Sequence, residues 1–210
     1  MRGAELLDDD AIVHDLVVVA FDMCSSSRML EDLTRTGSLK QYDRMLKNLR
    51  LWLAANALSS KFALYKFTGD GWILLFPAPT VTGEGLMSFL LRLSKKHQSF
   101  REHFVDGHLE SRPDSVGLTF GLDMGPVRKL ILGNEVEFVG RPINVACRLQ
   151  SAVKDKKPGP DYRCLMSRKI YNTYMTEVEG FHFGSATRGL RNISGGESYQ
   201  CYKVDFTRAM

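Results

Sequence analysis

The sequence Leu16-Val-Val-Val-Ala-Phe-Asp22 is rich in β-branched residues and is apolar up to its final carboxylate. A run of this kind is typical of a central strand that is buried on both faces of a sheet. The next residues, Met23 to Ser27 (MCSSS), are small enough for their backbone N–H groups to turn toward an anion before a helix begins. We therefore expect a buried strand that ends at Asp22, beside an anion site.

Two amphipathic helices and a hairpin are expected after this strand. Residues 38–58 and 82–104 carry apolar side chains at helical spacing. Between them, residues 61–67 and 71–76 are two β-rich runs, and the Asp70-Gly71 pair between such runs is a strong hairpin signal. The hairpin tip is therefore expected to carry Asp70, and its strands to lie beside the first strand.

The remaining sequence indicates a sheet with further helices. We expect strands at 116–122, from 126 to near Gly133, near 163–166, at 179–186 and at 199–205, with helices at 143–153 and 168–174. Residues 154–161 predict a surface loop. The pattern predicts one α+β domain over residues 1–210, with a mostly antiparallel sheet and helices on one face. Residues 1–12 are expected to form a flexible N-terminus.

Composition excludes several classes of protein. The chain has 210 residues, of which 44% are apolar and 25% charged, as in ordinary globular proteins. The six-residue apolar run at 16–21 is too short to cross a bilayer, and the acidic start argues against a signal peptide, so we expect a cytoplasmic protein without a membrane partner. A net charge of +4 is too small to indicate a nucleic-acid partner. Four scattered cysteines suit reduced thiols better than a zinc site.

Asp22 and Asp70 are the candidate metal ligands. Two carboxylates beside a phosphate-sized nest suit Mg²⁺ or Mn²⁺, because substrate phosphates then complete the octahedron. Each residue also has an ordinary structural interpretation. Asp22 and the serine run could serve as helix-capping residues, and Asp70 could simply form a turn.

Four motifs in order resemble the catalytic domain of class III nucleotidyl cyclases, over nearly the whole chain. They are FDMCSSS at 21–27, KFTGDG at 66–71, VGLTFGLDMGPV at 116–127 and VGRPINVACRL at 139–149. The resemblance implies a ferredoxin-like cyclase fold. It also implies that a nucleotide's 3′-hydroxyl attacks its own α-phosphate and expels pyrophosphate, with two Mn²⁺ or Mg²⁺ ions in each site.

The resemblance also assigns roles to residues. It implies that Asp22, Asp70 and the carbonyl of Met23 hold the metal ions. The β- and γ-phosphates would be cradled by the backbone of Cys24, Ser25, Ser26 and Ser27. Asn144 would orient the ribose and Arg148 would meet charge on the α-phosphate; their spacing of four places them on one helix face. Without the motif, Asn144 and Arg148 would be interpreted as ordinary polar residues on a surface helix.

Active sites of this family are shared between two protomers, so the resemblance implies a homodimer with two equivalent sites.

The resemblance also implies a base pocket. Lys66 occupies the position that is Lys in adenylate and Glu in guanylate cyclases, which disfavours guanine. The second base-binding position of the family falls at Glu137. Strand alternation predicts that Tyr65 and Lys66 point to opposite faces, so that only one of them lines the base pocket. The family's triphosphate Lys would fall near Ser194, and Arg191 or Arg188 could replace its charge.

The serine run and the short architecture resemble the bacterial pyrimidine cyclases of Pycsar anti-phage systems. This resemblance implies that UTP is converted to cyclic UMP, an alarm signal for a separate effector protein. Cyclic CMP and cyclic AMP are the alternative products. An inert, dimerising nucleotide-binding domain is the alternative from a different class, and it would be expected to lack some of the metal or Asn/Arg residues that this chain retains.

Overall fold

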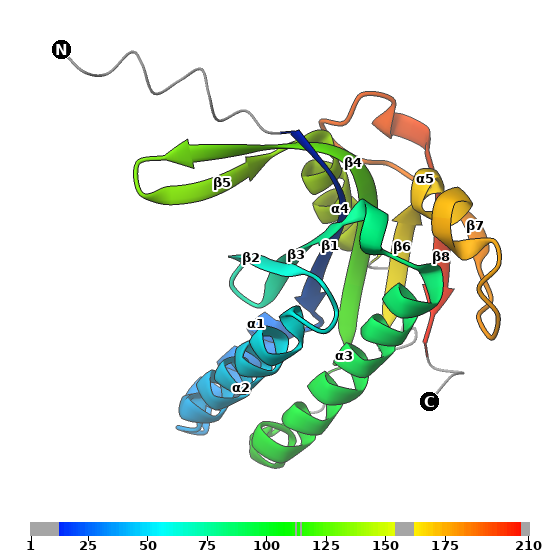
Figure 1. The fold of residues 1–210 in the computed structure, drawn as a ribbon. Coiled ribbons are helices and arrows are strands. Elements are labelled where there is room, and N and C mark those ends of the chain that lie inside the picture. Colours follow the sequence, from blue (N-terminus) through cyan, green and yellow to red (C-terminus); the bar gives the residue numbers. More distant parts are fainter. Residues whose placement is uncertain (1–12, 112, 114, 154–161, 207–210) are drawn as a thin grey trace.

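The computed structural model describes residues 13–111, 113, 115–153 and 162–206 (Figure 1). Its sheet has eight strands in the order β2-β3-β1-β4-β6-β8-β7, with β5 paired to β4. The strands are β1 (Val13–Met23), β2 (Ala63–Phe67), β3 (Gly71–Pro77), β4 (Leu118–Leu132), β5 (Glu135–Val139), β6 (Arg163–Ser167), β7 (Gly184–Arg188) and β8 (Tyr199–Asp205). The helices are α1 (Ser26–Arg35), α2 (Leu39–Ala57), α3 (Gly83–Phe104), α4 (Arg141–Ala152) and α5 (Arg168–Ile170), which continues as a π-helical turn, Tyr171–Met175.

β1 is the central strand that its sequence predicts. It pairs antiparallel with both β3 and β4, and Val17, Val18 and Val19 are fully buried. The α+β class and the mostly antiparallel sheet are confirmed, because the only parallel pairing among the described strands joins β4 to β6.

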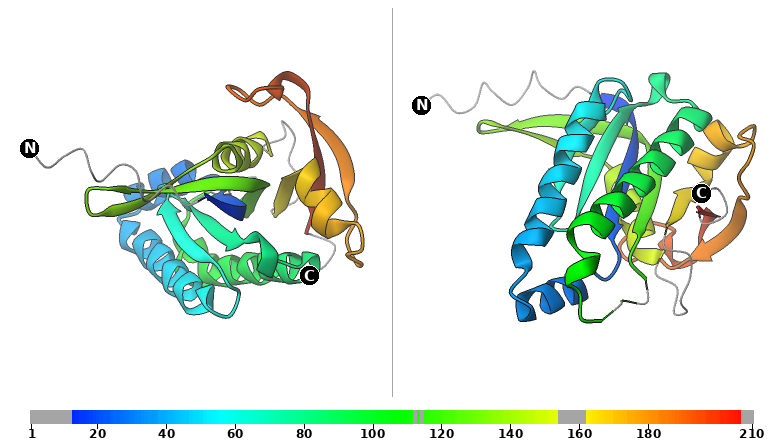
Figure 2. Two further views of the ribbon diagram at one scale, coloured as in Figure 1. Left: turned by 45° about the horizontal axis from the view of Figure 1, so that its top comes forward. Right: turned by 90° about the horizontal axis from the view of Figure 1, so that it is seen from below.

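The placement of every helix on one face was wrong. Helices α1, α2 and α3 cover one face of the sheet, and α4 covers the opposite face (Figure 2, left). Val17 and Val19 belong to the buried cluster on the first face, whereas Val18 and Ala20 share a cluster with Ala146 of α4. A strand that is apolar on both faces must be covered on both. Gly121 of β4 permits the close approach of α4, because a Cβ there would lie 2.0 Å from the Ala146 carbonyl oxygen.

β4 and β5 form an arm that projects from the sheet (Figure 1). We expected a strand break at Met124-Gly125-Pro126, but β4 runs through it unbroken for 15 residues, and the turn comes at Gly133. Gly125 adopts a φ of +151°, which allows the strand to continue through this point. Four apolar side chains of the arm are about half exposed: Ile131, Leu132, Val136 and Val139.

The remaining expectations hold with shifted boundaries. The strand expected at 179–186 begins only at Gly184, and the helix expected at 168–174 is split into α5 and the π-helical turn. The loop at 154–161 and the N-terminal residues 1–12 lie outside the described residues. Among the described helices, none combines the length and the apolar character needed to cross a membrane.

Candidate active site

The structure places Asp70 beside the end of β1. Asp22 pairs with Gly71 across the β1–β3 ladder, and Asp70 immediately precedes Gly71 at the hairpin tip. Glycine is required here because a Cβ at position 71 would lie 1.9 Å from the Phe21 carbonyl oxygen. The close backbone contact therefore fixes the relative position of the two aspartates.

Helix α1 begins at this point. The Ser26 hydroxyl donates a hydrogen bond to the Asp70 carboxylate. Ser25 is left-handed, with a φ of +57°, and Ser27 is exposed in the first turn. The N–H groups in the first turn of a helix have no partner within the helix, and they lie at the positive end of the helix dipole. Both properties favour binding of an anion.

Cys24 differs from the sequence-based expectation. Its N–H donates to the Gly117 carbonyl at 2.9 Å, so this group extends the pairing of β1 with the residue preceding β4 instead of facing an anion. The Cys24 N–H is therefore not available to an anion, and the cradle expected of Ser25, Ser26 and Ser27 stays a prediction. Met23 is buried, and the role predicted for its carbonyl stays a prediction.

Tyr42 of α2 contacts the residue that follows Asp22, which the sequence did not reveal. It is buried, and its hydroxyl donates to Met23 Sδ at 3.9 Å. Burial raises the pKa of this phenol above its usual range, and the negative charges of Asp70 and Asp22 add to the shift. The available signal was a phenol hydroxyl on an otherwise apolar helix face.

A second unforeseen contact supports the Asp22 backbone. Gln150 Nε2 donates to Thr119 Oγ1 at 2.8 Å, and this hydroxyl donates to the Asp22 carbonyl at 3.4 Å. Thr119 is fully buried in β4 and Gln150 is buried in α4. A polar chain thus runs from α4 to the backbone at the end of β1.

Asn144 and Arg148 lie on the exposed side of α4, one turn apart. Helix α4 covers the face of the sheet opposite to α1 and Tyr42. Within the described part of the chain, neither side chain forms a hydrogen bond or ion pair with Asp70. Asp22 follows Val18 and Ala20 at alternating positions of β1, so it points toward the face of the sheet that α4 covers.

Tyr65, Lys66 and Glu137 meet between β2 and β5, as the predicted base pocket requires. The Tyr65 hydroxyl donates to one Glu137 oxygen, and Lys66 Nζ lies 3.1 Å from the other. The expectation that only one of Tyr65 and Lys66 faces this site was wrong. A register shift between Leu64 and Lys66 interrupts strand alternation at Tyr65, so both side chains reach the same carboxylate.

The three side chains shift one another's titration. Hydrogen bonds from Tyr65 and Lys66 lower the pKa of Glu137, and the Glu137 hydrogen bond raises the pKa of Lys66. Burial, followed by the hydrogen bond to Glu137, raises the pKa of Tyr65. The Phe138 N–H also donates to the Tyr65 hydroxyl, at 3.1 Å. At neutral pH the site therefore holds a charged pair capped by a neutral phenol.

Arg191 is exposed in the turn between β7 and β8, and no contact among the described residues joins it to Asp22 or Asp70. Arg188 Nε donates to the Ala152 carbonyl at the end of α4, at 3.3 Å. The triphosphate role of either arginine stays a prediction.

The donors at the β1 end fit a hard divalent cation. Asp22 and Asp70 supply carboxylate oxygens, which Mg²⁺ and Mn²⁺ prefer. The described residues hold no group of three or more His, Cys, Asp or Glu side chains placed to bind a metal. A cation here would therefore need oxygen ligands from a substrate to complete its shell.

Comparison with solved structures identifies the fold. The chain is similar to the adenylyl cyclase CyaB from P. aeruginosa, with a TM-score of 0.72 and 18% identity over 93% of this chain and 96% of that one. It is also similar to the guanylyl cyclase Cya2, with a TM-score of 0.71 and 14% identity over 93% and 94% of the two chains. A third similar structure is the guanylate cyclase domain of RhGC from Catenaria anguillulae in complex with GTP, with a TM-score of 0.67 and 21% identity over 92% and 98%.

These likenesses show that the chain has the fold of class III nucleotidyl cyclase catalytic domains. No family model matches the sequence, and no curated protein matches it. At identities near 20% the likeness establishes the fold, and the function must be argued from the site.

Proposed function

We propose that this chain is a metal-dependent pyrimidine nucleotide cyclase that converts UTP to cyclic UMP and pyrophosphate. The observation that carries the proposal is the meeting of Asp22 and Asp70 at the start of α1, in the fold of adenylyl and guanylyl cyclases. In this reaction the 3′-oxygen loses its proton and bonds to the α-phosphorus. The bond from that phosphorus to the bridging oxygen breaks, and pyrophosphate leaves with the electron pair.

The chain's residues have distinct tasks in this reaction. Asp22 and Asp70 would hold Mg²⁺ or Mn²⁺, which when bound supplies positive charge to the triphosphate and activates the hydroxyl. Ser26 holds the Asp70 carboxylate in place. The first-turn N–H groups of α1 would bind the β- and γ-phosphates. Asn144 would position the ribose, and Arg148 would stabilise charge on the α-phosphate.

The contents of the base site favour a small base. The Tyr65 phenol is tied to both Glu137 and the Phe138 backbone, beside Lys66. A fixed aromatic ring at this position takes space from the base, which favours a pyrimidine over a purine. Lys66 and Glu137 offer a donor and an acceptor to the edge of the base. Uracil and cytosine differ at that edge, so cyclic CMP is the nearest alternative product.

The chain would work as a homodimer with shared sites. Within the described part of one chain, neither Asn144 nor Arg148 forms a hydrogen bond or ion pair with Asp70, and a second copy would bring its own Asn144 and Arg148 to these aspartates. The product would act as a second messenger read by a separate effector protein, in defence against phage.

Product analysis tests the proposal. The purified protein is incubated separately with ATP, GTP, CTP and UTP plus MnCl₂, and the products are resolved by chromatography and mass. We expect cyclic UMP to dominate and the Asp22→Asn variant to lose about 100-fold or more in rate, because an amide carries no charge for the cation. The matched control, Asp43→Asn, removes an exposed carboxylate from α2 and should leave the rate unchanged.

Dominant cyclic CMP or cyclic AMP would overturn the uracil specificity while retaining a cyclase. Absence of any cyclic product with all four nucleotides, by protein that binds them, would instead indicate an inert nucleotide-binding domain. Full activity in Asp22→Asn would overturn the assignment of the site.

A further inference from the structure

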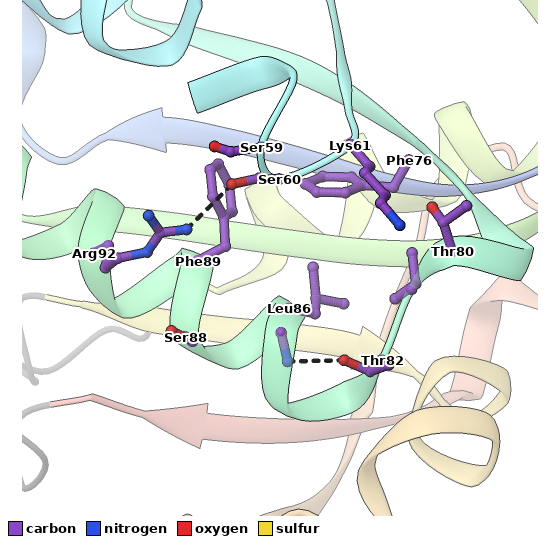
Figure 3. A pocket seen from close by; sticks show the side chains of 12 residues that line it. Ser59, Ser60, Lys61, Phe76, Thr80, Thr82, Leu86, Ser88, Phe89 and Arg92 are labelled. Atoms are coloured by element: carbon purple, nitrogen blue, oxygen red, sulfur yellow. Dashed lines mark hydrogen bonds between the residues drawn. The ribbon is translucent and has the colours of Figure 1, made fainter. Parts of the chain in front are cut away.

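A polar cavity of about 250 Å³ lies where the turn after α2 meets the first half of α3 (Figure 3). Lys61 stands at one end and Arg92 at the other, with Phe76, Leu86 and Phe89 between them. Serine and threonine hydroxyls complete much of the lining, and no lining residue is acidic. The cavity thus combines two cations, several hydroxyls and an apolar floor.

This cavity is separate from the candidate active site. Phe76 lies at the far end of β3 from Gly71, five residues along the strand. At about 3.4 Å per residue, this corresponds to roughly 17 Å. The two sites therefore lie at opposite ends of the same strand, and a ligand here would not occupy the place of the substrate.

Neither cation is neutralised by a described residue. Arg92 donates to Asn56 Oδ1 at 3.3 Å and to Ser60 Oγ at 3.1 Å, and both acceptors are uncharged. The Lys61 ammonium has no hydrogen bond or ion pair with any residue that the structure describes. Glu84 and Glu179 border a neighbouring hollow beyond Arg92, outside this cavity.

The backbone at Lys61 is costly for a lysine. Its φ is +55°, in the left-handed region that favours glycine. The Phe62 N–H donates to the Ala57 carbonyl and the Lys61 N–H to the Leu58 carbonyl, which closes α2 as a Schellman motif. Lysine thus stands where glycine would fit the backbone best, with its side chain lining the cavity.

We propose that this cavity binds a small organic phosphate. The phosphate group would lie between the Lys61 ammonium and the Arg92 guanidinium, because both carry uncompensated charge and Arg92 keeps unused N–H donors. The neighbouring serine and threonine hydroxyls would donate to the remaining oxygens. The cavity of about 250 Å³ leaves room beside the phosphate group for a carbon skeleton, above the buried side chains of Phe76, Leu86 and Phe89.

The test measures binding in EDTA, so that metal-dependent binding at the candidate active site does not contribute. The probes are ribose 5-phosphate, inorganic phosphate and uncharged ribose, titrated into ¹⁵N-labelled protein. We expect ribose 5-phosphate to shift the amide signals of Ser60, Lys61 and Gly85, and to bind more tightly than inorganic phosphate. Ribose should not bind.

Three variants separate binding from folding. Lys61→Gly removes the ammonium but suits the left-handed backbone, so its Tm should not fall below that of the wild type. It should raise the Kd for ribose 5-phosphate about tenfold or more, as should Arg92→Gln. The control, Lys47→Ala, removes an exposed lysine from α2 and should leave the Kd unchanged.

Absence of saturable binding by the wild type up to about 50 mM ligand would overturn the proposal. So would an unchanged Kd in both Lys61→Gly and Arg92→Gln, which would place the ligand elsewhere. Equal affinities for ribose 5-phosphate and inorganic phosphate would overturn the preference for an organic phosphate.

Discussion

At the residue scale, Tyr65 makes the most contacts in the proposed base site, with both Glu137 and the Phe138 backbone. The Tyr65→Phe variant removes a hydroxyl that donates to Glu137 and accepts from the Phe138 N–H. The pKa of Glu137 should rise, because the hydrogen bond that lowers it most is lost. A net hydrogen bond contributes about 1 kcal/mol, so discrimination between UTP and ATP in kcat/KM should fall roughly five- to tenfold.

Tyr174→Phe is the matched control for this change. It removes a phenol hydroxyl that donates to the Ala78 carbonyl at 2.9 Å, away from Lys66 and Glu137. The ratio of kcat/KM for UTP to kcat/KM for ATP should be the same in Tyr174→Phe as in the wild type. An unchanged ratio in Tyr65→Phe as well would show that the phenol does not select the base.

His97 should make stability depend on pH. It is fully buried in α3, and burial lowers its pKa to about 3, from an ordinary value of 6.5 in the unfolded chain. Between pH 6.5 and 3, His97 is therefore protonated in the unfolded state but neutral in the folded state. The stabilisation is fully present above pH 6.5 and is lost as the pH falls toward 3, by about 1.4 kcal/mol per pH unit.

Urea unfolding between pH 7 and about pH 4.5 measures this effect. Over that range the wild type should lose more free energy of unfolding than His97→Gln, which cannot titrate. His103→Gln removes an exposed histidine at the end of α3, and it should follow the wild type. Parallel curves for wild type and His97→Gln would contradict the prediction.

At the scale of elements, Gly121 is where α4 meets the sheet. In Gly121→Ala the new Cβ would lie 2.0 Å from the Ala146 carbonyl oxygen and 2.2 Å from the Gln150 nitrogen. Both atoms belong to helix backbone, so α4 would have to move. We expect the free energy of unfolding to fall by ~2 kcal/mol or more.

Chemical denaturation of Gly121→Ala and Gly184→Ala checks this expectation. A Cβ at Gly184 of β7 would meet nothing within 4 Å, so this variant changes the residue type without a clash. It should remain within about 0.5 kcal/mol of the wild type. A loss of similar size in both variants would mean that the α4 contact is not the cause.

The elements with strong periodicity were predictable from the sequence. β1, α2, α3 and the β2–β3 hairpin follow from hydrophobic patterning and from one Asp-Gly pair. The bulge at Tyr65 was not predictable, because it depends on how β2 pairs with β3. The sequence did not predict that β4 continues through Gly125-Pro126. Glycine and proline are turn signals locally, but here the pairing of these residues with β1 keeps the strand extended.

The candidate site was also predictable only in part from the sequence. The positions of Asp22 and Asp70 followed from where a strand ends and where a hairpin turns. The contact of Ser26 with Asp70, and the chain from Gln150 through Thr119, join residues that are far apart in the sequence. Such contacts depend on packing across the sheet, which no local pattern records.

At the scale of the whole molecule, the proposed dimer predicts complementation between inactive variants. The Asp22→Asn variant removes one of the two carboxylates proposed to bind the metal ions. The Arg148→Ala variant removes the arginine of the proposed Asn144/Arg148 pair on α4. If each site combines groups from two chains, a heterodimer of the two variants contains one intact site and one doubly damaged site. Random mixing should then restore about a quarter of the wild-type activity per chain.

Activity is assayed after the two variants are mixed and allowed to exchange subunits, with each variant alone as the control. Sedimentation with nucleotide present reports the dimer directly. Activity in the mixture no higher than in the separate variants would contradict shared sites.

The unbroken course of β4 has a consequence for amide hydrogen exchange. Residues 119–122 of this strand lie between β1 and β6, whereas residues 130–132 pair with β5 alone among the residues that the structure describes. Amides in the first group can reach water only when the central sheet opens, so they should exchange at a rate set by global unfolding. Amides near the tip of the arm should exchange far sooner, so that one continuous strand spans nearly the full range of protection in the molecule.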